Sequence, residues 1–159
     1  MVDRESRIQA ISVLKRLALG RSTSYDSENI LMDLCATTSD PIIYALFKTV
    51  FEIGGDCDES LACVFSKGSK MRKRICRWIL FLKTDLKYEW PKERLAPGIK
   101  DFYKPNWFDK LFGLDARIML SNKTFMSRGD YQVWPFFRQS DLEGAKEICR
   151  NRLLSQGAK

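Results

Sequence analysis

The chain has 159 residues, of which 45% are hydrophobic and 30% are charged, a size and composition that fit one globular domain with a sizeable core. It carries a formal net charge of +7 and contains no histidine. The lack of histidine excludes Ser-His and Cys-His nucleophile pairs and ordinary zinc hydrolysis, and most hydrolase mechanisms are excluded with them.

Charged and aromatic residues are distributed unevenly along the chain. Residues 1–66 contain 6 Lys and Arg against 10 Asp and Glu, whereas residues 67–159 contain 21 against 10. The second half also contains all four tryptophans and 14 of the 19 aromatic residues. An asymmetry of this kind concerns the partners of a protein rather than its fold. We therefore interpret residues 1–159 as a single domain with an acidic helical half, 1–66, and a basic, aromatic-rich half, 67–159.

Apolar residues recur at helical spacing in the first half. They predict helices over residues 4–19, from about residue 27 to 35, and over residues 41–53, with Gly20 ending the first and Asp26 or Ser27 capping the second. Asp40 and Pro41 are a capping carboxylate followed by a proline at the first helical position. The helix over residues 41–53 is apolar around most of its circumference, so we expect it at the centre of the core. A short helix from Asp58 to Phe65 follows.

The segment from Lys70 to Lys83 has the pattern of a basic amphipathic helix. At 100° per residue, one face collects the apolar residues Met71, Ile75, Trp78, Ile79 and Leu82. The opposite face collects the cations Lys70, Lys73, Arg74 and Arg77. Such a cationic stripe is either a solvated helix surface or a docking surface for a negatively charged partner.

The rest of the second half is less regular, because prolines at 91, 97 and 105 interrupt it. Alternation around Tyr88 and Trp90 predicts a short strand, and residues 107–120 fit one more helix. Residues 123–126 and 131–136 flank a turn at residues 127–130, which predicts a β-hairpin. Ser140 and Glu143 form a capping box before a last helix. The expected fold is mainly α, with a small irregular β-hairpin in the C-terminal half; an α+β fold is the alternative.

Metal, cofactor and catalytic signatures are incomplete. The five cysteines are odd in number, are widely spread, and have no histidine beside them to complete a zinc site, so we expect reduced core thiols and no bound metal or cofactor. Asp56, Asp58 and Glu59 are the densest acidic group; they fit the start of a helix better than a magnesium site. We assign no catalytic residue.

We expect neither a secretory signal nor a membrane span in this sequence. The first twenty residues carry charges throughout and lack the apolar core of a secretory signal. Purely apolar runs such as Trp78–Leu82 are far shorter than the roughly twenty residues of a membrane span. We expect a cytoplasmic protein without a membrane partner.

The features that remain favour binding over catalysis. We expect a non-catalytic protein-binding module, such as a small bacterial regulator or a toxin-neutralising immunity-type protein, that covers an acidic surface with Lys70, Lys73, Arg74 and Arg77. Trp107 and Trp134 lie in aromatic clusters that either fill the core or anchor such an interface. A nucleic-acid-binding protein that uses the basic half is the first alternative, and a carboxylate- or thiol-dependent enzyme is the second. The sequence leaves the oligomeric state open.

Overall fold

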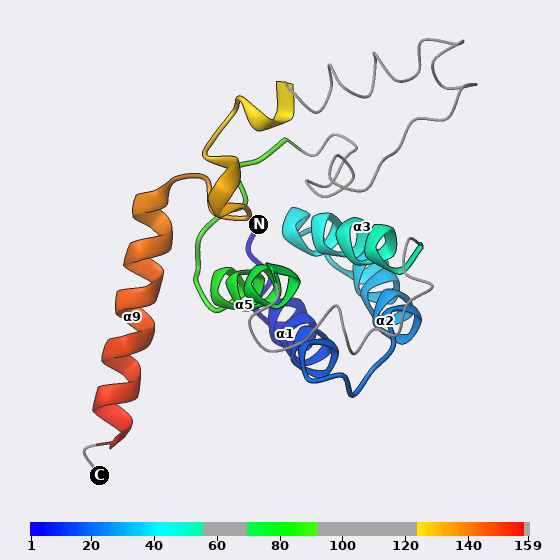
Figure 1. The fold of residues 1–159 in the computed structure, drawn as a ribbon, viewed down its shortest axis with the longest axis horizontal. Coiled ribbons are helices and arrows are strands. Elements are labelled where there is room, and N and C mark those ends of the chain that lie inside the picture. Colours follow the sequence, from blue (N-terminus) through cyan, green and yellow to red (C-terminus); the bar gives the residue numbers. More distant parts are fainter. Residues whose placement is uncertain (56–69, 92–123, 158–159) are drawn as a thin grey trace.

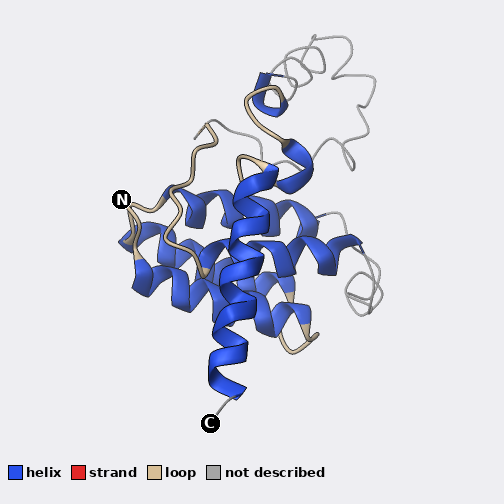
Figure 2. Cartoon of the chain, turned by 90° about the vertical axis from the view of Figure 1, so that its left-hand side faces the viewer, coloured by secondary structure: helices blue, strands red, loops and turns tan. Residues whose placement is uncertain are grey.

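The computed structural model describes residues 1–55, 70–91 and 124–157. Within these residues the chain is mainly helical, as the sequence predicts. The helices are α1 (Arg4–Ala18), α2 (Ser24–Thr37), α3 (Pro41–Gly55), α5 (Lys70–Leu82) and α9 (Gln139–Gly157), with a short 3-10 helix η1 (Tyr131–Val133). Helix α1 packs against α2 on one side and α5 on the other, and α3 packs mainly on α2. Helix α9 stands beside this bundle and contacts α5 (Figure 1, Figure 2).

Local capping explains where the first helices begin and end. The carboxylate of Asp3 accepts a hydrogen bond from the backbone of Ser6 and caps α1. Gly20 has φ 65°, and Gly20 and Arg21 donate to the carbonyls of Leu17 and Arg16, which is the glycine-dependent ending that the sequence indicates. Helix α2 starts three residues earlier than a cap at Asp26 implies, because Thr23 and Asp26 form a reciprocal capping box.

Helix α3 contributes much of the core, but it is not surrounded. Ile42, Ile43 and Leu46 are fully buried, whereas Tyr44 is 46% and Phe51 57% exposed. We expected this helix at the centre of the core, but one of its faces is exposed to solvent. Half-buried Phe47 lies between these two residues, with its ring 6.5 Å from that of Tyr44 and 6.2 Å from that of Phe51.

Helix α5 follows the predicted amphipathic pattern closely. Met71, Ile75, Trp78 and Leu82 are buried, and Ile79 is half-buried. Phe81 is also buried, at 2% exposure, because its ring meets the rings of Tyr88 and Phe136 edge-on. This helix joins α1 to the C-terminal part of the chain.

The predicted β-hairpin is not formed. Residues 124–126 are helical and Tyr131–Val133 is a 3-10 turn, and no strand occurs in the described ranges. The backbone N–H of Asp130 donates to the carbonyl of Phe137, so the segment closes on itself instead of pairing as two strands. Pro135 has no N–H to offer a ladder. Val133, Trp134 and Phe136 are buried, so the apolar side chains of this segment pack inward from a compact turn.

The short strand predicted near Tyr88 and Trp90 is likewise absent. Trp90 is 2% exposed because its ring stacks on Phe125, with 4.9 Å between centroids, and meets Phe137 edge-on. Its indole N–H donates to the carbonyl of Phe136 at 3.1 Å. Aromatic packing, not a ladder of backbone hydrogen bonds, fixes this segment.

Helix α9 starts at Gln139, so Ser140 lies inside the helix and is not its cap. Leu142 and Ala145 are buried, but Ile148, one turn later, is 51% exposed. Cys149, the residue after Ile148, is half-buried, and together with Arg152 it lines the groove described below.

Candidate partner-binding surface

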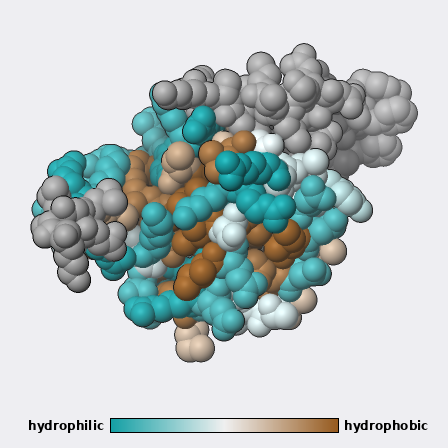
Figure 3. Space-filling view, turned by 90° about the horizontal axis from the view of Figure 1, so that it is seen from below, coloured by the Kyte–Doolittle hydropathy of each residue, from teal (hydrophilic) through white to brown (hydrophobic). Residues whose placement is uncertain are grey.

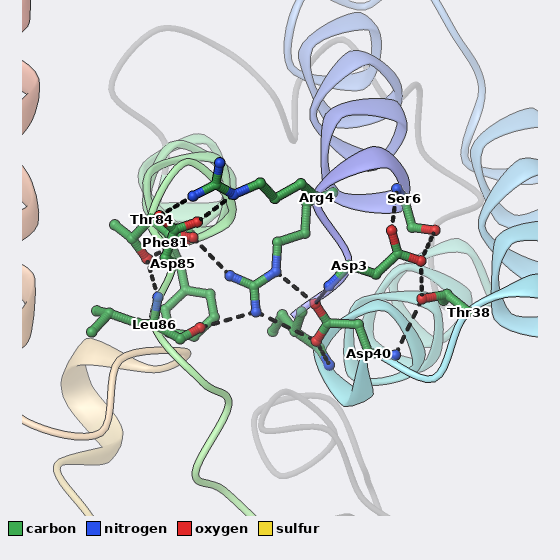
Figure 4. A network of polar contacts seen from close by, with 11 residues as sticks. Asp3, Arg4, Ser6, Thr38, Asp40, Phe81, Thr84, Asp85 and Leu86 are labelled. Atoms are coloured by element: carbon green, nitrogen blue, oxygen red, sulfur yellow. Dashed lines mark hydrogen bonds and ion pairs between the residues drawn. The ribbon is translucent and has the colours of Figure 1, made fainter. Parts of the chain in front are cut away.

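A buried ion pair between Arg7 of α1 and Asp40, just before α3, organises one end of the bundle. The Arg7 Nε donates to Asp40 Oδ2 at 2.7 Å, and the two side chains are only 2% and 1% exposed. Arg7 also donates to the carbonyls of Thr84 at 2.8 Å and Leu86 at 3.0 Å (Figure 4). One guanidinium thus joins α1, the start of α3 and the segment that leaves α5.

The same end of α1 carries a second polar cluster. Asp3 Oδ2 accepts hydrogen bonds from the hydroxyls of Thr38 and Ser6, each at 2.7 Å (Figure 4). These hydrogen bonds stabilise the carboxylate and lower its pKa from 3.8 to about 2. The bond from Thr38 has the largest effect and that from Ser6 the next largest. The turn between α2 and α3 is thereby tied to the first residues of α1.

This depressed pKa gives a pH-dependent expectation. The ionised Asp3 stabilises the folded protein above its unfolded pKa of about 3.9, and the contribution is lost as the pH falls toward 2. Replacing Thr38 with valine removes the main donor, so the Asp3 pKa should rise toward 3.8, as measured by a carboxyl carbon NMR titration. Thr37→Val is the matched control, since the Thr37 hydroxyl donates to the Leu34 carbonyl. An unchanged pKa in Thr38→Val would contradict the assignment.

An open groove lies beside this end of the bundle. Its volume is about 490 Å³, and α1, the end of α5 and α9 each supply a wall. Its apolar lining comes from Ile8, Ile11, Leu82 and Cys149, and Ile8 is 66% exposed. Seen from below, hydrophobic surface is visible between hydrophilic side chains (Figure 3). An apolar groove that remains open to solvent is a candidate binding surface.

Each wall of the groove also supplies a cation. These are Arg4 from α1, Lys83 after α5 and Arg152 from α9. Arg4 forms a two-point contact with Asp85, at 2.9 and 2.6 Å, in which both side chains are largely exposed. Lys83 and Arg152 have no carboxylate partner among the described residues. The groove therefore has an apolar floor and a net positive rim.

The predicted cationic stripe on α5 is divided by its surroundings. Lys73 is exposed, while Arg74 and Arg77 are half-buried. Arg77 donates a hydrogen bond to the carbonyl of Gln132. Its pKa is lowered mainly by burial and, to a smaller extent, by the nearby charge of Arg74. The side chain of Lys70 lies outside the described residues, although α5 begins there. Arg77 thus holds the segment around η1 in place instead of standing free for a partner.

The two proposed aromatic anchors have different outcomes. Trp134 is 5% exposed, meets Trp78 edge-on at 5.5 Å and donates its indole N–H to the Tyr88 hydroxyl at 3.1 Å. It belongs to the core and offers no surface to a partner, so we no longer treat it as an anchor. Trp107 lies outside the described residues.

Sequence reasoning missed the groove and the residues that form it. Ile8, Ile11, Leu14 and Leu17 recur every three residues, an interval that suggests one apolar face, Ile8 included, turned toward the core. A signal for its exposure was present, because Ala10, Val13, Leu14 and Leu17 define a different buried face. Their position on α1 leaves Ile8 outside the core.

In the described ranges, no cluster of three or more cysteine, aspartate or glutamate residues could hold a metal ion. No helix in the same ranges is long and apolar enough to span a membrane. No protein-family model, curated protein or solved structure matches the chain.

Proposed function

We propose that this protein is a non-catalytic binding module whose partner is a protein with an acidic surface. The observation that carries the proposal is the groove between α1, α5 and α9, with its apolar floor and a cation on each wall. A protein interface needs apolar side chains for affinity and complementary charge for orientation and speed of association. A small regulator or an immunity-type protein that covers part of a toxin would use such a surface.

The lining of the groove favours binding over catalysis. Among the described residues that line it, the one thiol is Cys149 and the one carboxylate is Asp85, which Arg4 already binds through both oxygens. The described lining gives the thiol no neighbouring base that would activate it. A thiol- or carboxylate-dependent enzyme is therefore the weaker proposal.

A nucleic-acid partner is the second candidate, because residues 70–83 contain six cations and no acidic residue. Phosphate-driven binding weakens steeply as salt rises, whereas apolar contacts retain most of their affinity. The apolar floor of the groove favours the protein partner, since a phosphate backbone gains nothing from Ile8, Ile11 or Leu82.

Two charge-reversed variants test the proposal. Lys83→Glu with Arg152→Glu alters the groove, and Lys73→Glu with Arg128→Glu makes the same change in charge at exposed sites outside its lining. The full-length proteins serve as bait in a nuclease-treated extract of the source cell. We expect the wild type and the Lys73/Arg128 variant to retain one acidic protein that the groove variant loses. With that protein purified, the groove variant should bind about tenfold more weakly in calorimetry.

Three outcomes would count against the proposal. Release of the captured material by nuclease, with a steep salt dependence, would show a nucleic-acid partner. Equal capture by all three proteins would show that the groove cations take no part. Loss of binding only in the Lys73/Arg128 variant would move the partner to the outer face of α5. Thermal melting should be nearly the same for all three, because exposed charges contribute little to stability.

A further inference from the structure

We infer that the partner enters the groove as an acidic amphipathic α-helix. This inference rests on the proposed function and specifies the element that the partner presents. It follows from the length of the groove, the side chains that line it and the position of its charges.

The length of the groove fits a short helical segment. Arg4, Ile8 and Ile11 lie at positions i, i+4 and i+7 of α1, and they line the groove over two helical turns, about 10 Å. A partner helix lying along this wall would present two or three anchor side chains at the same kind of spacing.

The lining disfavours the other common modes of peptide recognition. Addition of a β-strand needs an open sheet edge, and the described residues around the groove are helices and one connecting segment. Recognition of proline-rich peptides needs an aromatic-lined groove, whereas the apolar side chains among the described lining residues are aliphatic apart from a thiol: Ile8, Ile11, Leu82 and Cys149. A helix that inserts aliphatic side chains is the mode that this lining accommodates.

The charges determine the polar face of that helix. Arg4, Lys83 and Arg152 come from three different walls, so a helix in the groove would have cations around it. Aspartate or glutamate beside its aliphatic anchors can pair with Lys83 and Arg152, and can compete with Asp85 for Arg4. Lysine or arginine at the same positions would be repelled.

The test uses full-length protein and a displayed library of random 18-residue peptides. We expect selection of peptides with net negative charge and aliphatic residues spaced i, i+3 or i+4, and i+7. A synthetic selected peptide should bind about tenfold more weakly, by fluorescence anisotropy, to Ile8→Ser and to the Lys83→Glu/Arg152→Glu variant. Met32→Ser is the matched control, since Met32 is 51% exposed on α2 and does not line the groove; it should bind as the wild type does.

A proline placed centrally in the selected peptide identifies its conformation. A helix should lose at least about tenfold in affinity, because an interior proline removes a backbone hydrogen bond and clashes with the preceding turn. Acidic peptides that require Ile8 but tolerate the proline would overturn the helix while leaving the proposed function intact. Basic peptides, no enriched peptides, or binding unaffected by both groove variants would overturn the inference. If an acidic protein is still captured through Lys83 and Arg152, the proposed function survives that result.

Discussion

Replacing Arg7 with methionine is expected to lower the free energy of unfolding by about 3–5 kcal/mol, because Asp40 would remain as a buried charge without its partner. The carbonyls of Thr84 and Leu86 would lose a donor in the same change. Methionine has a similar length and fills most of the space, so the loss reports charge and hydrogen bonding more than a cavity. Urea unfolding followed by tryptophan fluorescence measures it.

Arg4→Met is the matched control, because Arg4 also pairs with an aspartate, but at the surface. The Arg4 and Asp85 side chains are 76% and 64% exposed, so the expected loss is below about 1 kcal/mol. A similarly small loss for Arg7→Met would mean that the Asp40 carboxylate becomes hydrated or protonated in the variant. Asp40→Asn in the Arg7→Met background distinguishes these cases, since it removes the unpaired charge and should restore part of the stability.

Local sequence signals were enough to predict α1, α2, α3, α5 and α9, but not the helical turn at residues 124–126 or η1, and the helices predicted over 58–65 and 107–120 lie outside the described residues. The buried faces of α1 and α5 follow helical periodicity, and Gly20 ends α1 with the conformation that glycine favours. Each signal lies within a few residues of the structure that it specifies. The exact caps were harder to choose, because Thr23, Asp26 and Ser27 are all good capping residues. Only the reciprocal bonds of Thr23 and Asp26 settle which of them caps α2.

The groove could not be predicted, because its residues meet only through long-range packing. Ile8, Lys83 and Arg152 come from segments far apart in the sequence, and nothing near any of them indicates the other two. Arg7 shows the same limit. It lies among other charged residues of α1, and only the approach of Asp40, 33 residues later, explains its burial.

The cationic and aromatic patterns were detected, but composition could not show which of these residues reach solvent. Arg77 fits a solvated stripe by phase, yet the segment around η1 packs over it and receives its hydrogen bond. Trp134 fits an interface anchor by type, yet Trp78 and Tyr88 enclose it. In both cases the second half of the chain folds back on α5, a contact that helical periodicity does not encode.

Phe136→Ala is expected to cost about 3–5 kcal/mol of unfolding free energy, because the side chain is fully buried and its removal opens a cavity. The Phe136 ring meets Phe81 of α5 edge-on at 5.1 Å and so joins α5 to the segment that leads into α9. Phe51→Ala removes the same side chain from a site that is 57% exposed, and its cost in the same urea titration should stay below about 1 kcal/mol. An equally small loss of unfolding free energy in Phe136→Ala would show that Phe136 is not a core residue. The expected difference would confirm Phe136 as a core residue that joins α5 to the segment leading into α9, the third wall of the groove.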